Sequence, residues 1–507
     1  MPVKPTYPGV YVEEIPIGAR SIAPASTSVA LFIGRMPWGS VDLPVMCNSY
    51  GDFEREFTGD PTLGALPHAV RLFFSNGGTQ CYVMRLNGTT AAGERARAAV
   101  ANTAEGKLMA TAVHPGTAGN TIRFVISHPP GQTDAYTFTV QIFRVKNTAA
   151  ALKTDLEVYD GVSLQTSSPT YIGNYVKSRW LKFDVINNEG RPDENARGAD
   201  REFIPYSVGA GTDGEGLSVE DYRQAFITCG NKIDIFNLLL LPADTSLVDT
   251  QLLWKHASGF CQERRAFLLL DPPTAWTGTD PGAMSTSLVA LYPDLVKDHS
   301  AVFFPNILIN DSGTQQELGP AGAIAGVIAR TDANRGVWKS PAGMEAILTG
   351  ITGLAYRLNE YESETLNRQG INAIRIFPSG IVNWGARTMA GNDQFASEWK
   401  YIAVKRTALF IEESLYRGLQ WVVFEPNNEN LWAQVCLTAG AFLQYLYRQG
   451  AFQGASADKA YFIRCDTSTN TQQDINLGRL NIQIGFAPLK PAEFVIIHVQ
   501  IKVMLPG

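Results

Sequence analysis

The chain has 507 residues, which is too long for one ordinary core, so we expect two to four domains. Hydrophobic residues make up 45% and charged residues 18%, and the net charge of -6 argues against a surface that binds nucleic acid. The six cysteines are scattered without a Cys-x-x-Cys pair, which disfavours both a zinc site and a secreted disulfide framework. We interpret them as reduced, mostly buried thiols.

The N-terminal residues contain Pro2, Pro5 and Pro8 and no apolar core segment, so we do not expect a secretory signal peptide. The longest apolar runs, 235–241 and 321–329, are far shorter than the roughly 20 residues that a membrane span needs. We therefore expect a protein that is made and folded in a cytoplasm and that does not insert into a membrane.

The first 95 residues predict an arm followed by the start of an α/β domain. Residues 1–27 are rich in Pro, Ser and Ala and contain one strand-like run, Val10, Tyr11, Val12, Glu13, Glu14 and Ile15. Residues 28–95 alternate apolar strands with a helix at 66–74, which Asn76-Gly77-Gly78 would end.

Residues 96–205 differ in texture from the flanking regions. Segments with a period of two, separated by Pro and Gly turns, predict a small antiparallel sandwich, with strands at 107–113, 121–127 and 136–145. We interpret this region as an inserted β domain.

The α/β alternation resumes at 206–365, where helices and apolar strands follow one another. The predicted helices are 221–228, 249–263 and 284–296, and the predicted strands are 233–241, 266–270 and 301–309. Helices of this length between strands imply parallel pairing. Residues 28–95 and 206–365 would then form one discontinuous α/β domain.

A further unit is expected at 366–493, with long helices at 398–419 and 428–448. The second helix carries one apolar stripe, which consists of Trp432, Val435, Ala439, Phe442 and Leu446. We favour a face turned toward the core, with packing on a partner as the alternative.

Two apolar strands are predicted near the C-terminus. In 494–507 the β-branched residues Val495, Ile497, Val499, Ile501 and Val503 share one face, and Leu480, Ile482, Ile484 and Phe486 share a face in the strand before it. The two strands are natural pairing partners. Patterning leaves open whether each chain end pairs within its own subunit or adds a strand to a neighbour's sheet.

Several blocks resemble the tail sheath proteins of contractile phages, R-type pyocins and related injection systems. They are Tyr7-Pro-Gly-Val-Tyr-Val-Glu-Glu14, Phe73-Phe74 with Asn76-Gly77-Gly78, Cys81 to Arg85, Ala325 to Asp332, Gly336 to Gly343, Gly370 to Arg375, Trp384 to Thr388, Phe410 to Ser414, Trp421 to Asn427 and Gly485 to Phe494. They occur in the family's order over 7–494, and the 96–205 region carries little of the match. Gly319-Pro320-Ala321-Gly322 and the short Phe377-Pro378-Ser379-Gly380 depart from the family pattern.

The resemblance implies a structural subunit and not an enzyme. It implies a subtilisin-like α/β middle domain without protease function, an outward-facing β insertion, and a C-terminal domain that contacts an inner tube. Hexameric rings would stack around that tube and interlock through the terminal arms. The implied partners are the chain itself, the tube, the baseplate and the terminator or cap proteins, in a phage tail or a contractile injection particle.

The sequence offers little for catalysis or cofactor binding, so we expect no cofactor and no metal. None of the six histidines stands in a recognisable catalytic context, and no Gly-x-Ser-x-Gly occurs. Gly209-Ala-Gly-Thr-Asp-Gly214 matches a dinucleotide fingerprint literally, but the next helix is predicted to begin after an N-cap at Ser218 with Glu220 and Asp221 in its first turn, where they would repel phosphate. We interpret the glycines as a flexible connection.

Lys405, Arg406, Glu412 and Glu413 lie on the predicted 398–419 helix. They are read either as an ordinary solvated face or, through the resemblance, as contacts to the tube. The alternatives to a sheath subunit are an oligomeric subtilisin-fold hydrolase and another structural component of the same machine, such as a tube or baseplate protein.

Overall fold

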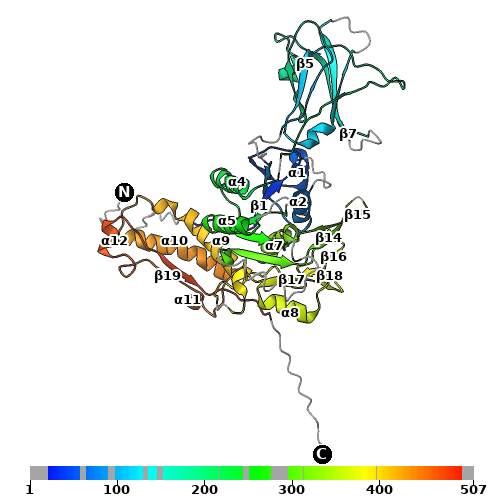
Figure 1. The fold of residues 1–507 in the computed structure, drawn as a ribbon. Helices are drawn as coiled ribbons and strands as arrows, with labels where there is room; N and C mark the ends of the chain where they lie inside the picture. The colour runs from blue at the N-terminus through cyan, green and yellow to red at the C-terminus, as the bar shows by residue number, and fades with distance from the viewer. Residues whose placement is uncertain are drawn as a thin grey trace, which may run out of the picture. The chain divides into compact units, whose positions relative to one another are not determined.

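The computed structural model describes residues 21–57, 64–88, 97–128, 135–145, 152–214, 216–243, 250–273, 276, 295–311, 313–394 and 397–493. The chain divides into two compact units. Unit 1 comprises residues 1–27, 331–341 and 396–507, and unit 2 comprises 28–330 and 342–395. Figure 1 labels helices and strands of both units.

Unit 2 is built on a mixed eight-stranded sheet of order β18-β17-β13-β12-β11-β1-β3-β2. Six central strands run parallel, and β2 and β18 pair antiparallel at the two ends. The strands are β1 (Ala30–Arg35), β2 (Pro44–Cys47), β3 (Cys81–Leu86), β11 (Leu238–Leu240), β12 (Phe267–Leu270), β13 (Ser300–Phe304), β17 (Ile371–Phe377) and β18 (Gly380–Asn383). The parallel pairing that the α/β alternation predicts is observed.

Helices of unit 2 pack around this sheet. They are α1 (Tyr50–Phe57), α2 (Ala65–Ser75), α4 (Val219–Lys232), α5 (Thr250–Glu263), α7 (Ala321–Arg335) and α8 (Glu360–Arg368), with the end of α7 counted in unit 1. The contact of α7 with α2 requires glycine, because a Cβ on Gly322 would lie 2.5 Å from the Ala69 carbonyl oxygen and one on Gly326 would lie 2.4 Å from that of Phe73. Two backbones therefore meet directly in the core.

The predicted strand at 301–309 is two strands in two sheets. Phe304-Pro305 is a cis peptide, and Pro305 cannot donate a ladder hydrogen bond, so β13 ends at Phe304 and β14 (Ile307–Asp311) starts in a new sheet. That sheet has the order β15-β14-β16, where β15 is Thr314–Leu318 and β16 is Gly353–Leu354. Most of the predicted helix at 284–296 lies outside the described residues.

The region 96–205 forms two antiparallel sheets around a core of its own, with short helices η2 (Thr117–Thr121) and α3 (Ile172–Tyr175). One sheet contains β4 (Val100–Asn102), β5 (Leu108–Ala112) and β9 (Leu181–Val185). The other contains β10 (Tyr206–Ser207), β6 (Ile122–Ser127), β7 (Thr137–Val145) and β8 (Lys153–Ser163). The three strands predicted from the period of two correspond to β5, β6 and β7.

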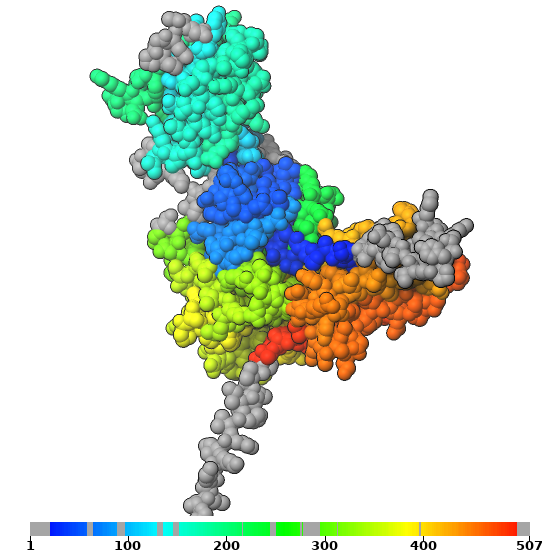
Figure 2. Space-filling view, turned by 180° about the vertical axis from the view of Figure 1, so that it is seen from behind, coloured from blue at the N-terminus to red at the C-terminus, as the bar shows by residue number. Residues whose placement is uncertain are grey.

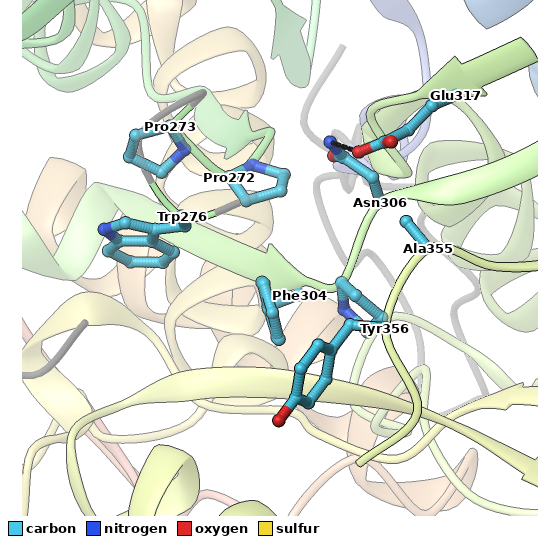
Figure 3. Close-up of a pocket in the computed structure, with 9 residues that line it drawn as sticks. Pro272, Pro273, Trp276, Phe304, Asn306, Glu317, Ala355 and Tyr356 are labelled. Carbon is cyan, nitrogen blue, oxygen red and sulfur yellow. Dashed lines mark hydrogen bonds between the residues drawn. The ribbon is translucent and has the colours of Figure 1, made fainter. Parts of the chain in front are cut away.

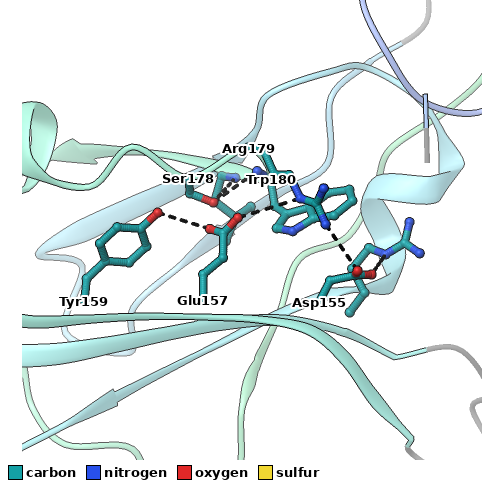
Figure 4. Close-up of polar contacts among 8 residues, drawn as sticks. Asp155, Glu157, Tyr159, Ser178, Arg179 and Trp180 are labelled. Atoms are coloured by element: carbon teal, nitrogen blue, oxygen red, sulfur yellow. Dashed lines mark hydrogen bonds and ion pairs between the residues drawn. The ribbon is translucent and has the colours of Figure 1, made fainter. Parts of the chain in front are cut away.

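A charged cluster packs between β8 and the residues before β9 (Figure 4). The Arg179 guanidinium lies over the Trp180 ring at 4.4 Å and pairs with Asp155 at 3.2 Å. Arg144 reaches the same carboxylate at 3.0 Å and lies 4.7 Å from the Trp180 centroid. Hydrogen bonding to Glu157 and, above all, burial raise the pKa of Tyr159 to about 12. The cluster ties the long end strand β8 to the facing segment.

Arg85 joins the insertion to the α/β sheet within unit 2. Its side chain is 0% exposed and donates to the carbonyl oxygens of Met36 at 2.5 Å, Gly39 at 2.7 Å and Pro115 at 2.7 Å. Burial lowers the pKa of Arg85 to about 10, against the opposing field of Asp213. This residue of the Cys81–Arg85 block thus has a structural role, because its hydrogen bonds hold the two parts of unit 2 together.

The Gly209–Gly214 segment is held by specific contacts and is not the flexible connection that we predicted. Asn120 bonds both the amide and the carbonyl of Gly211, and Asp213 accepts hydrogen bonds from the Thr117 amide and hydroxyl. The helix begins where the sequence predicts, because Ser218 and Asp221 form a capping box at the start of α4.

Unit 1 contains the two long helices and a small sheet. Its elements are α9 (Ile402–Gly418), η6 (Gln420–Val422), α10 (Glu429–Arg448), α11 (Ala457–Ala460), β19 (Tyr461–Arg464), α12 (Gln472–Asn476) and β20 (Gln483–Phe486). The predicted boundary at 366 differs from that of the compact units, because β17 pairs with β13 and unit 1 resumes only at 396.

Candidate functional site

The strand predicted at 480–486 is found as β20, and it pairs antiparallel with β19. Ile463 stands opposite Ile484 and Tyr461 opposite Phe486, and all four pack against the apolar core of unit 1. The partner that we predicted for this strand, residues 494–503, lies outside the described residues, so that pairing stays a prediction. Within the described chain the sheet has two strands, and two strands are marginally stable by themselves.

The two edges of this sheet differ. Beyond β20 the chain bonds to residues before α11, because the Gln453 amide donates to the Ala487 carbonyl at 2.9 Å. On the solvent face the Phe462 ring, 48% exposed, covers Gly485, where a Cβ would lie 2.2 Å from Phe462 Cε1. Among the described residues, no third strand pairs with β19 or β20.

Helix α10 supplies an uncharged surface beside β19. Tyr461 Oη donates to Gln444 at 2.8 Å, and Ile463 lies 3.6 Å from a Cβ built on Gly440, so β19 runs along that stripe of the helix. The next stripe is exposed and contains Leu437 at 58% and Tyr445 at 49%. Since α10 carries no charge between Glu429 and Arg448, this exposed stripe is suited to burial.

The predicted stripe Trp432, Val435, Ala439, Phe442 and Leu446 is buried, as a core-facing helix requires. Leu480 and Ile482 pack with Trp432 and Val435. The residues just before β20 thus pack on the buried stripe of α10, whereas β19 lies beside Gly440 and Gln444 of the same helix.

Residues 22–27, the last part of the predicted 1–27 arm, are fastened along α9. The Ala25 amide donates to Ser414 Oγ at 3.0 Å, and Arg406 Nη2 donates to the Thr27 carbonyl at 2.8 Å. Ile22 fits against Gly418, where a Cβ would lie 2.6 Å from Ile22 Cγ1. Figure 2 shows this dark blue segment lying along the orange C-terminal part. Val10–Ile15 lie outside the described residues.

The C-terminal segment is fastened at the opposite end of the same helix. Tyr401, the N-cap of α9, donates through its hydroxyl to Glu493 at 3.2 Å. A helix of 17 residues is about 25 Å long, so Ile22 at Gly418 and Glu493 at Tyr401 lie near opposite ends of one rigid element. Val495, Ile497, Val499, Ile501 and Val503 lie beyond the described residues.

Three of the four predicted tube contacts have partners inside unit 1. Arg406 is 4% exposed and pairs with Asp332 through contacts of 2.6 and 2.9 Å. Lys405, 7% exposed, lies 4.7 Å from the Trp399 centroid, and Glu413 pairs with Arg417 at 2.6 Å. The solvated face that we predicted as one reading is not observed for these three, whereas Glu412 is exposed.

Two family models match most of the second half of the chain. The phage tail sheath protein central domain matches residues 224–389, and the phage tail sheath C-terminal domain matches residues 396–502. The chain belongs to the phage tail sheath family. This is a family of structural tail proteins and not of enzymes.

Individual relatives of this sheath chain are distant. A putative prophage major tail sheath protein of Pseudomonas aeruginosa strain UCBPP-PA14 is 27% identical over 243 residues, which span 46% of this chain and 58% of that protein. The contracted helical sheath of the anti-feeding prophage is 23% identical with a TM-score of 0.58, covering 98% of this chain and 99% of that one. The sheath tail protein of Desulfitobacterium hafniense is 14% identical with a TM-score of 0.64, covering 90% and 94%. The structural neighbours establish the mixed α/β fold of the sheath chain with its large sheet and smaller antiparallel sheets.

Three of the six histidines of the sheath chain have structural partners. His299 Nδ1 contacts the Ala266 carbonyl at 3.0 Å, His128 Nε2 contacts that of Pro192 at 2.8 Å, and His68 Nδ1 contacts Arg71 at 3.1 Å. Among the residues that the structure describes, no group of three or more acidic, His or Cys side chains is placed to hold a metal ion. None of the described helices is long and apolar enough to cross a membrane.

An apolar pocket lies where β12 and β13 end in unit 2 (Figure 3). The rings of Trp276, Phe304 and Tyr356 line it, and the hydrogen bond from Asn306 to Glu317, at 2.8 Å, lies at its rim. The side chains of Trp276 and Phe304 are only 1% and 2% exposed, so these two rings offer little accessible surface to a ligand.

Proposed function

We propose that this chain is the sheath subunit of a contractile tail or injection machine. Subunits polymerise as stacked hexameric rings around an inner tube and are interlocked by terminal arms, and the lattice shortens to drive the tube through a target envelope. In this proposal the α/β domain is subtilisin-like and the 96–205 insertion faces outward. The particle is assembled in the cytoplasm of the producing cell and belongs to a phage tail or an injection device.

The observation that carries the proposal is the β19–β20 sheet with its neighbouring uncharged helix face. A strand added at an edge of this sheet would gain backbone hydrogen bonds of about 0.5–1.5 kcal/mol each, and the exposed Leu437 and Tyr445 of α10 offer apolar surface for it to cover. The 494–503 segment has a matching apolar face, and each Val or Ile that it buries adds roughly 1.5–3 kcal/mol. One joint is modest, but a lattice repeats it in every subunit.

The fastened arm roots support the same proposal. Ile22 and Glu493 are held at opposite ends of α9, so a pull on one arm reaches the other through a helix and not through a loop. The proposed arm residues, Val10 to Ile15 and 494–503, would pair with sheets of neighbouring copies. The other proposed partners are the inner tube, the baseplate and the terminator or cap proteins. The chain is similar over 99% of its length to a chain of the anti-feeding prophage baseplate structure, with a TM-score of 0.56.

Negative-stain microscopy of the expressed protein tests the proposal, with striated tubes or polysheath expected. Deletion of residues 1–16 should leave a folded subunit that does not polymerise, and normal tubes from that truncation would refute the arm model. Leu437→Lys should also prevent tube formation while leaving the melting of the subunit unchanged. Ile227→Lys on α4, at 56% exposure, is the control matched in exposure.

The alternative of a subtilisin-fold hydrolase, which needs a serine nucleophile, can be examined at the start of the buried helix α7. This helix begins at Ala321, just after Gly319-Pro320, and an alanine side chain is not a nucleophile. A fluorophosphonate probe should label no serine of the folded protein. A tube or baseplate role would instead give no sheath-like polymer and binding to a sheath from another source.

Of the four residues that we predicted to contact the tube, Glu412 remains a candidate with an exposed side chain. Glu412→Lys should reduce co-purification with the tube protein if this helix faces the tube. Unchanged co-purification would remove α9 from the tube interface. The same reversal at Arg406 is not informative, because it would break the buried pair with Asp332.

A further inference from the structure

The antiparallel pairing of β2 with β3 places two cysteines opposite each other. In the register, Cys47 pairs with Cys81, and both are 0% exposed. Side chains directly opposite in an antiparallel pair have Cβ atoms about 4.5–5.5 Å apart. A disulfide needs about 3.5–4.5 Å between Cβ atoms and 4.4–6.8 Å between Cα atoms, so a small approach of one end strand suffices.

The two thiols also touch. Burial, a side-chain hydrogen bond with Cys47 and the charge of Cys47 raise the pKa of Cys81 well above its usual range. None of the other cysteines stands opposite a cysteine in a strand register, although Cys436 lies close enough to Cys465 for its charge to help raise the pKa of that thiol. Cys229 Sγ donates to Met84 Sδ at 3.2 Å, Cys436 Sγ faces the Cys465 carbonyl oxygen at 4.0 Å, and Cys261 is buried in the core. The register thus singles out Cys47 and Cys81 as facing partners.

We propose that Cys47 and Cys81 form a disulfide across β2 and β3 when the folded chain meets a small-molecule disulfide such as oxidised glutathione. The thiolate of one cysteine attacks the oxidant, releases one glutathione thiol and forms a mixed disulfide. The second cysteine then attacks the protein sulfur and releases the second glutathione. The two protein thiols lose two electrons and two protons, and the oxidant gains both as two thiols.

Access to the buried pair requires local opening of β2. This strand has four residues and lies at the end of the sheet. Leu43, just before the strand, and Met46, within it, are 44% and 47% exposed. Short end strands open more easily than central ones. Oxidation is therefore slow in the native chain and faster in urea too dilute to unfold it.

The disulfide would close the loop that contains α1 and α2 and fix the end of the sheet. The chemistry of the disulfide does not depend on the proposed function, but the time at which we expect it to form rests on that function. A sheath assembled in a reducing cytoplasm meets an oxidising medium only after the particle is released, so the bond would form after assembly.

Peptide mapping of the full-length, unassembled subunit tests the proposal independently of tube formation. Protein purified with reductant is exposed to oxidised glutathione at pH 8, with and without sub-denaturing urea, and is then acid-quenched, alkylated and digested with trypsin. We expect tryptic peptides 36–55 and 72–85, which hold one cysteine each, to be cross-linked. The urea midpoint should rise and return to its starting value with dithiothreitol.

Cys229→Ser should leave the cross-link intact, whereas Cys47→Ser and Cys81→Ser should abolish it and stop at a mixed disulfide. If either of these variants fails to fold, the map of the wild-type chain still decides. The proposal is overturned if peptides 36–55 and 72–85 stay separately alkylated after oxidation in dilute urea. It is also overturned if the cross-link appears only at the rate of global unfolding.

Discussion

Replacing Asp332 tests how the root of the N-terminal arm is held. Arg406 donates Nη1 to Asp332 Oδ1 at 2.9 Å, Nη2 to Oδ2 at 2.6 Å and Nη2 to the Thr27 carbonyl at 2.8 Å. Both charged side chains are 4% exposed. Asp332→Asn would leave a buried guanidinium without its counter-charge, and breaking such a pair costs about 3–5 kcal/mol.

The double variant separates the charge pair from the rest of the clamp. Arg406→Met alone leaves a buried carboxylate and a Thr27 carbonyl without its donor, so it should cost about as much as Asp332→Asn. Arg406→Met with Asp332→Leu removes both charges. Because an apolar replacement of a buried pair is often neutral, the double variant should be at least about 2 kcal/mol more stable than the sum of the single losses.

Hydrogen exchange read by mass spectrometry on α9 and residues 22–27 is the suitable assay, because the chain has two units and global unfolding is not expected to be two-state. The control is Glu364→Gln on α8, which breaks an exposed pair with Arg368 and should change stability by less than about 1 kcal/mol. A cost below 1 kcal/mol for Asp332→Asn, or strict additivity in the double variant, would refute the reasoning.

Three further predictions concern unit 2 and are measured by urea unfolding. Gly326→Ala should be strongly destabilising, because the new Cβ would lie 2.4 Å from the Phe73 carbonyl oxygen, whereas Gly259→Ala in α5, with open space around its Cβ, should stabilise by about 0.5–1 kcal/mol; equal effects would contradict the close helix contact. Burial raises the pKa of Asp271 to about 6 from 3.8, against the hydrogen bond from the Ala321 amide, so the folded state binds the proton more tightly and stability should fall as the pH rises from 4 to 6, a slope that Asp271→Asn removes. Burial, with the charge of Arg85, lowers the pKa of His114 to about 4, so the effect of this group on stability has the opposite sign. Its contribution to stability is lost as the pH falls from 6.5 to 4, and His114→Gln should abolish that loss.

The sequence was most informative where local chemistry decides the structure. The Ser218 cap of α4 and the end of α2 at Asn76 each follow from side chains that bond neighbouring backbone groups. The strands of the insertion follow from a period of two that only half-buried strands show. These features need no knowledge of distant residues.

It was less informative where a distant partner decides. Pro305 reads as part of a continuous apolar run, and only the pairing of β14 with β15 and β16 shows that a second sheet begins there. The β20 strand was recognised, but its described partner β19, a four-residue strand with no strong alternation, was not, and the predicted pairing with 494–503 lies outside the described residues. Register between short strands depends on what their faces pack against, which patterning does not specify.

The charged residues of α9 show the same limit at the candidate site. Lys405, Arg406 and Glu413 look like a solvated stripe in the sequence, yet each is buried against a specific partner. The sequence did contain a signal. Apolar residues occupy nearly all of the remaining positions from Ile402 to Ile411, so this part of the helix has no polar face for water. A charge on such a helix must be paired inside the protein. Arg406 pairs with Asp332 and also donates to the Thr27 carbonyl in the root of the chain's own arm. The charge pattern of α9 therefore points to arm anchoring before it points to an external partner.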